Sequence, residues 1–191
     1  FVGVDRGASW SKFGDLPTVA VDDILVHPRD GDLIIATHGR SLFIVDDVRP
    51  LQQLTLDMRE KPAHLFPVRE ATGFHMMPGF VDWQGKGNFR GENPPEGALI
   101  SVYVKSYTGD EVKIKITDPT GATVAKLKLP GTPGLNRVAW DLKPTKDVLT
   151  EYGGEGQKHV KPGEYSVTLA FGNYSQTQKM QVTIAPGVDT R

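Results

Sequence analysis

Apolar and polar side chains alternate through the C-terminal half of the chain. The alternation has a period of two over residues 98–104, 112–116, 124–129, 135–142, 165–171 and 177–184. This period is typical of β-strands that bury one face, because successive side chains of a strand point to opposite sides. Short strands that follow one another this closely are typical of two packed sheets. We therefore predict a β-sandwich over residues 95–187.

Two tight turns fit this prediction. Asp118-Pro119-Thr120-Gly121 carries Asp, Pro and Gly at the positions that a type I turn favours. Gly172-Asn173 predicts a two-residue hairpin turn between the last two strands. No stretch repeats its apolar residues with the 3.6-residue period of a helix, so the pattern predicts an all-β fold.

Residues 1–48 are predicted to form short strands joined by tight turns. Residues 10–13 are predicted as one strand, and residues 20–26 have the apolar content of a buried strand. Residues 33–37 and 41–45 predict a hairpin around His38-Gly39-Arg40, in which the glycine supplies the positive φ that such a loop needs.

The character of the sequence changes over residues 49–94, where prolines and glycines interrupt the chain repeatedly. This composition predicts an extended connector between two domains. The segment also contains Phe74, Phe80, Trp83 and Phe89, more aromatic side chains than a free linker carries. We therefore expect the connector to pack along the neighbouring domains.

Composition excludes several classes of function. The chain of 191 residues has no Cys, which excludes disulfides, thiolate catalysis and cysteine-bound zinc. Its formal charge is −1, so no overall field attracts nucleic acid. No apolar run is long enough to cross a membrane. The chain begins with Phe1 inside an apolar run, from which we expect further residues upstream, because an unpaired apolar strand is an open edge.

One local motif is more specific than the strand pattern. The stretch from Asp5 to Trp10 reads Asp-x-Gly-x-Ser-Trp. The Asp5 carboxylate is expected to accept hydrogen bonds from the backbone of its own turn, and Gly7 to allow the turn conformation. Ser9 completes the motif, and Trp10 is expected to open the next strand and bury its ring between sheets.

This stretch resembles the Asp box of β-propeller blades, although Gly3 stands where the full motif has Ser or Thr. Further matches follow in Thr37-His38-Gly39-Arg40, in the aliphatic-Asp-Asp ending at Asp47, and in segments 94–98, 134–142 and 162–167. As a set they resemble the C-terminal part of bacterial sortilin-like, BNR-repeat propeller proteins of the glycosyl hydrolase type. The C-terminal part of that family is an immunoglobulin-like sandwich similar to that of the flagellar hook-capping protein.

The resemblance implies that residues 1–48 are the last blade strands of an incomplete propeller and that residues 95–187 are the immunoglobulin-like domain. It further implies an exported protein, extracellular or periplasmic, whose C-terminal part is a non-catalytic structural or interaction module bound to the rest of the propeller. Two alternatives stay open. In the first, the longer protein that contains this chain is an active glycoside hydrolase whose catalytic carboxylates lie in other blades. In the second, the propeller of that longer protein binds peptides and proteins, as sortilin does.

Few residues are candidates for ligand contacts, and none for catalysis. His38 and Arg40 are candidates for contact with an anionic or sugar ligand, or they only fix their turn. Trp83 is a candidate for stacking on a sugar, or it joins the two domains. Two paired strands carry a basic stripe of four lysines, Lys113, Lys115, Lys126 and Lys128. This stripe either holds an anionic glycan or only keeps the sheet soluble. No histidine spacing predicts a metal site, and no motif predicts a cofactor.

Overall fold

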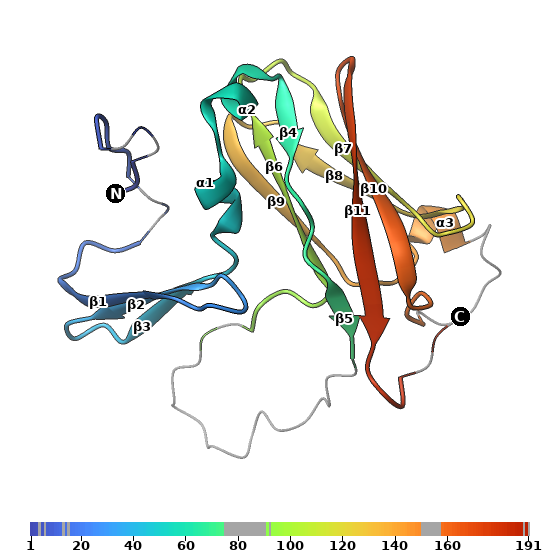
Figure 1. Ribbon diagram of the computed structural model, residues 1–191, viewed down its shortest axis with the longest axis horizontal. Helices are drawn as coiled ribbons and strands as arrows, with labels where there is room; N and C mark the ends of the chain where they lie inside the picture. Colours follow the sequence, from blue (N-terminus) through green and yellow to red (C-terminus); the bar gives the residue numbers. More distant parts are fainter. Residues whose placement is uncertain are drawn as a thin grey trace. The chain divides into compact units, whose positions relative to one another are not determined.

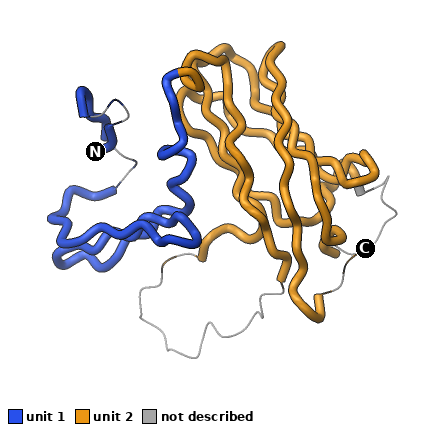
Figure 2. Tube along the Cα trace, viewed as in Figure 1, with its two compact units in different colours: residues 1–56 blue, residues 57–191 orange. Residues whose placement is uncertain are grey.

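The chain forms an all-β protein with three sheets and a few short helices (Figure 1). The computed structural model describes residues 1–3, 5, 7–12, 14, 16–74, 91, 93–149, 158–188 and 190. The chain divides into two compact units, residues 1–56 and residues 57–191 (Figure 2). No helix in the described part of the chain is long and apolar enough to span a membrane.

Unit 1 contains a three-stranded antiparallel sheet in the order β1–β2–β3. The strands are β1 (Val21–Val26), β2 (Leu33–Thr37) and β3 (Leu42–Val45), followed by the short helix α1 (Arg49–Gln53). The predicted hairpin is confirmed, with Ile35 opposite Phe43 and Leu33 opposite Val45.

The turns of unit 1 depend on local hydrogen bonds. Gly31 has a φ of 72° and donates its N–H to the carbonyl of His27 at 2.9 Å. Asp32 then accepts the N–H of Asp47 through Oδ1 at 2.9 Å. Asp47 in turn accepts the Arg49 Nε–H at 2.6 Å, so the carboxylates that follow β1 and β3 fix the two loop ends.

The expected burial of β1 is wrong for this structure. All six of its residues are exposed, and Ile24 and Leu25 have exposed fractions of 61% and 55%. Apolar content shows which side chains favour a covered surface, but the covering surface has to come from elsewhere in the molecule. Among the described residues of unit 1, the buried apolar ones are instead Ile35 on the central strand, Val48 before α1 and Pro50 within it.

Unit 2 contains two sheets that enclose a shared core. The larger sheet has the order β5–β11–β10–β7–β8 and the smaller one the order β4–β6–β9. The bounds are β4 (Ala63–Leu65), β5 (Ala71–Gly73), β6 (Ala98–Val104), β7 (Glu111–Thr117), β8 (Thr123–Pro130), β9 (Gly134–Trp140), β10 (Gly163–Phe171) and β11 (Tyr174–Ile184). The last six strands match the six alternating stretches, so the prediction of strands there is confirmed.

The core consists of the inward-facing residues of both sheets. Val112, Ile114 and Ile116 alternate with exposed residues along β7, and Ile100 and Val102 are fully buried on β6. Burial of each such side chain contributes roughly 1.5–3 kcal/mol before the cost of chain ordering. The period-two pattern therefore reports directly which face of each strand lies inside.

The predicted connector contributes regular structure to unit 2. β4 pairs with β6 in the smaller sheet, and β5 pairs in parallel with β11 in the larger one. The Gln176 side chain links the two sheets, because its Nε2 donates to the Leu65 carbonyl at 3.0 Å and its Oε1 accepts the Leu65 N–H at 2.9 Å. Strands of three residues are too short to show alternation, which is why the sequence pattern does not reveal them.

Two further helices are short. α2 (Leu56–Glu60) lies where the two units divide, and α3 (Lys146–Leu149) follows β9. Near α3 the Thr145 hydroxyl accepts the Lys126 N–H at 3.1 Å and donates to Asp147 at 2.6 Å. α3 thus lies against the edge strand β8, and Thr145, which precedes α3, satisfies a backbone donor of β8 that would otherwise face solvent.

Candidate functional site

The Asp5 carboxylate closes a tight turn. Its Oδ1 accepts the Ser9 backbone N–H at 2.9 Å, and its Oδ2 accepts the Ser9 hydroxyl at 2.5 Å. Gly7 has a φ of 88°, in the region that favours glycine. The hydrogen bond from the Ser9 hydroxyl, followed by that from the Ser9 N–H, lowers the pKa of Asp5. The carboxylate is therefore a charged turn-forming group.

Trp10 departs from its expected environment. Its side chain is 63% exposed, and around it the described residues form only an isolated bridge between Val2 and Ser11 rather than a strand. The ring lies over its own turn, since a Cβ on Gly3 or Gly7 would be 3.5 Å or 3.7 Å from it. The prediction of a ring buried between sheets is wrong for this structure, and residues 10–12 of the predicted strand form no strand, while Phe13 lies outside the described residues.

His38 and Arg40 lie together at the tip of the β2–β3 hairpin. The His38 backbone N–H donates to the Ala20 carbonyl at 3.0 Å, and its exposed ring has Nδ1 at 3.7 Å from Asp22 Oδ2. Arg40 is exposed as well, so both side chains are open to solvent. The third candidate, Trp83, lies outside the described residues.

His64 is a buried polar group to which the sequence analysis assigned no role. Its ring is 6% exposed, packs edge-on against Phe66 at a centroid distance of 4.9 Å, and neither ring nitrogen has a hydrogen-bond partner among the described residues. Burial, with a smaller contribution from the charge of Lys61, lowers the pKa of His64, so the ring is neutral at pH 7. Within the described part of the chain no cluster of His, Asp or Glu could hold a metal ion.

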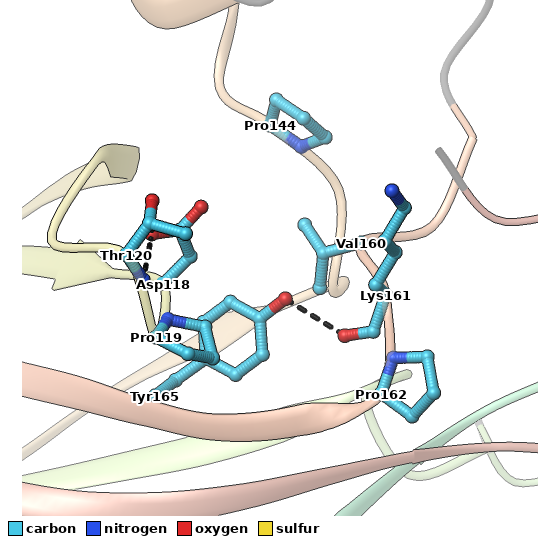
Figure 3. Close-up of a pocket in the computed structure, with 8 residues that line it drawn as sticks. All are labelled: Asp118, Pro119, Thr120, Pro144, Val160, Lys161, Pro162 and Tyr165. Atoms are coloured by element: carbon cyan, nitrogen blue, oxygen red, sulfur yellow. Dashed lines mark hydrogen bonds between the residues drawn. The ribbon is translucent and has the colours of Figure 1, made fainter.

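A cavity of about 440 Å³ opens beside Tyr165 in unit 2 (Figure 3). Figure 3 shows Pro119 beside the tyrosine ring and Val160 across the cavity. The full lining consists of Asp118, Pro119, Thr120, Pro144, Val160, Lys161, Pro162 and Tyr165. Three separate loops and strand β10 supply these residues, so no pattern in the sequence predicts the cavity.

The polar groups of this cavity are held in place by structural hydrogen bonds. Asp118 Oδ1 accepts the N–H and hydroxyl of Thr120 at 2.9 Å and 2.7 Å, and the Ala122 N–H at 3.0 Å. The Tyr165 hydroxyl donates to the Lys161 carbonyl at 2.7 Å. Burial, followed by the charge of Asp118, raises the pKa of Tyr165 to about 12. At neutral pH the Tyr165 hydroxyl is therefore protonated and engaged in a structural hydrogen bond.

Tyr165 makes the stability of unit 2 depend on pH in the alkaline range. The unfolded chain ionises near pH 10, whereas the folded chain keeps the proton up to about pH 12. The stability that Tyr165 contributes is thus fully present below pH 10. It is lost between pH 10 and 12, by about 1.4 kcal/mol for each pH unit.

The comparison is with Tyr165→Phe, measured by urea unfolding between pH 7 and 11.5. The native chain should be more stable than the variant by about 1 kcal/mol at pH 7, the value of the lost hydrogen bond. This difference should shrink above pH 10 and reverse near pH 11. A difference that stays constant across this range would contradict the raised pKa.

The four predicted lysines form a continuous basic surface on the larger sheet, which we call the lysine face. It consists of Lys113 and Lys115 on β7 and of Lys126 and Lys128 on β8. The register places Lys113 directly opposite Lys128 and Lys115 directly opposite Lys126. All four side chains are exposed, on the side of the sheet away from the core.

Taken together, these features define an all-β protein with a single-sheet unit and a two-sheet unit that encloses its own core. The chain matches no protein-family model, no curated protein and no solved structure. Its role therefore has to be inferred from its own exposed surfaces.

Proposed function

We propose that this chain is a non-catalytic structural and interaction module of an exported β-propeller protein. In this proposal unit 1 supplies the closing strands of the propeller, and unit 2 is an immunoglobulin-like sandwich that braces the propeller or presents it to a partner. The hydrogen-bonded turn at Asp5, which has the composition of an Asp box, supports the first part.

One observation supports the proposal most strongly, namely the exposed apolar surface of the sheet of unit 1. Ile24 and Leu25 are neighbours on β1, so they point to opposite faces of the sheet, and both are exposed. On β3, Leu42 and Ile44 are exposed as well. A small sheet with apolar side chains on both faces fits a propeller blade, which packs between two further sheets.

Substitutions on β1 test this proposal. In the 191-residue chain, Ile24→Lys and Leu25→Lys should each change the free energy of unfolding by less than about 0.5 kcal/mol, because both side chains are exposed. In a polypeptide that contains the whole propeller, each substitution should lower the free energy of unfolding by about 2 kcal/mol or more, because both faces of β1 are then covered and the charge is buried.

Thermal unfolding and hydrogen exchange of β1–β3 in both polypeptides provide the measurement. Protection of β10 serves as the internal control, because unit 2 has its own core and should respond equally in both. Equal tolerance of both lysines in the longer polypeptide would show that no neighbouring sheet covers β1, and the proposal would fail.

A glycoside hydrolase parent is a second candidate function, supported by the exposed position of His38 and Arg40 on one hairpin tip. Glycoside hydrolysis needs two carboxyl groups about 5–10 Å apart across the sugar. In that reading other blades supply the carboxylates and this hairpin supplies substrate contacts. Loss of turnover on His38→Ala together with Arg40→Ala in the whole protein would favour it over a purely structural role.

A further inference from the structure

The lysine face has an arrangement that stability alone does not favour. Lys113 and Lys115 lie directly opposite Lys128 and Lys126 on antiparallel strands. Like charges in directly opposed positions destabilise a sheet, because the side chains are only about 5 Å apart at their Cβ atoms. The four side chains therefore concentrate positive charge in a chain whose formal charge is −1.

Protection of a sheet edge explains only half of this arrangement. β8 is an edge strand, and lysines on an edge strand discourage pairing with other chains. Lys128 is paired with Glu111 at 3.0 Å and Lys126 lies 3.7 Å from Asp147. β7, in contrast, is an interior strand between β8 and β10, and its Lys113 and Lys115 form no ion pair with a described residue. These two lysines have no edge to protect, and no described carboxylate pairs with them.

The neighbouring strands continue the lysine face with small and hydroxyl-bearing side chains. Ala170 lies opposite Lys113 in the register of β10, and Thr168 lies opposite Lys115. One strand further along, Ser175 lies opposite Ala170 and Thr177 opposite Thr168. The sheet thus presents two parallel rows, each beginning with two lysines and ending in a hydroxyl group.

The small residues of β10 leave a trough between the lysines and the hydroxyl groups. A cavity of about 550 Å³ lies there, and Lys113, Lys115, Thr168, Ala170 and Ser175 are among its lining residues. Its remaining lining is Ile114, Lys126, Leu127, Lys128 and Asp147, so none of the described lining residues is aromatic. One wall of the trough is therefore cationic and the other offers neutral hydrogen-bonding groups.

We propose that the lysine face binds an acidic polysaccharide, with its anionic groups on Lys113 and Lys115 and its hydroxyl groups toward Thr168 and Ser175. A uronate chain has this combination, since each sugar carries one carboxylate and several hydroxyls. Single-stranded nucleic acid fits less well, because its sequence-independent binding relies on aromatic side chains for base stacking. The site lies wholly on unit 2, so an experiment on it tests this proposal independently of the proposed propeller contacts of unit 1.

Binding of oligogalacturonate of defined length to the intact chain, measured by calorimetry at several salt concentrations, tests the proposal. Affinity should fall about tenfold between 50 and 200 mM salt if about two lysines engage the polymer. The methyl-esterified oligomer, which keeps the hydroxyls but loses the charges, should bind at least about tenfold more weakly.

Variants separate this site from general charge attraction. Lys113→Gln with Lys115→Gln should weaken binding about tenfold, whereas Lys126→Gln with Lys128→Gln should have a smaller effect, because these two already face carboxylates. Lys61→Gln with Lys105→Gln removes the same charge from another part of unit 2 and should leave binding within about twofold. Asp147→Asn should strengthen binding, because it frees Lys126.

Three outcomes would overturn the proposal. The first is equal weakening by the β7 variant and by the Lys61 and Lys105 control, which would indicate general charge attraction. The second is equal binding of the methyl-esterified oligomer. The third is tighter binding of a single-stranded DNA oligomer or of anionic vesicles at matched charge and salt. Far-ultraviolet circular dichroism of each variant confirms that the sheet is intact, as expected for exposed positions.

Discussion

Trp140→Ala is expected to lower the free energy of unfolding of unit 2 by about 4 kcal/mol, the largest effect of any single substitution that we propose. The Trp140 side chain is 1% exposed and is the largest fully buried side chain among the described residues. Its removal leaves a cavity between the sheets that the surrounding strands can fill only in part, since sheet hydrogen bonds fix their spacing.

Trp140 also connects the core to two loops. Its Nε1 donates to the Lys143 carbonyl at 2.7 Å, and its ring packs on Tyr165 at a centroid distance of 5.8 Å. Truncation therefore leaves a carbonyl unpaired and removes one wall from the surroundings of Tyr165. Both effects add to the cost of the cavity.

Chemical denaturation followed by circular dichroism measures this loss. The Trp140→Phe variant keeps most of the aromatic ring but lacks the Nε1–H donor, so it should lower the free energy of unfolding by about 1–2 kcal/mol. Tyr107→Ala is the matched control for loss of an exposed aromatic ring, since Tyr107 is exposed, and it should change stability by less than about 0.5 kcal/mol. A Trp140→Ala variant as stable as that control would contradict the assigned core.

The second largest effect is expected for Gly97→Ala, at about 3 kcal/mol. Gly97 precedes β6 with a φ of 84°, where a side chain is strained. A Cβ at this position would lie 2.0 Å from the Trp140 carbonyl oxygen and 3.0 Å from the Asp141 Cα. Both of these atoms belong to the backbone, so the clash can be relieved only by moving β6 away from β9, which pair from Ala98 and Trp140 onward.

Gly109→Ala separates backbone strain from the clash. Gly109 has the same φ of 84°, but nothing lies within 4 Å of the position of its Cβ. The Gly109→Ala substitution should therefore lower the free energy of unfolding only by the strain of the positive φ, which is about 1 kcal/mol. Equal losses for the two variants in the same denaturation experiment would show that β6 and β9 can adjust at Gly97, contrary to our expectation.

The strands of unit 2 could be predicted from the sequence because each long strand carries its burial pattern in its own residues. Val112, Ile114 and Ile116 alternate with charged side chains, and β7 follows that pattern residue by residue. The positions of β4 and β5 could not be predicted in this way, because three residues show no period. Their place depends on partners more than 30 residues away along the chain.

The same distinction between local and long-range interactions separates the candidate sites that could be predicted from those that could not. The Asp5 turn could be predicted because all its hydrogen-bonding groups lie within five residues. The exposure of Trp10 and of β1 could not, because burial depends on what lies opposite. The lysine positions were evident in the sequence, but the direct opposition of Lys113 and Lys128 required the register. The cavity beside Tyr165 could not be predicted either, because residues from three loops and from β10 form it together.

The pairing of β5 with β11 also affects how the protein is synthesised. Ala71 lies opposite Val182, so the first strand of the larger sheet pairs with the last. The ribosome delivers residue 182 more than a hundred residues after residue 71, and until then β5 and one edge of β10 have no partner. Unit 2 therefore cannot complete the larger sheet until β11 has been synthesised and has left the ribosome, and until then the nascent sheet is exposed to chaperones.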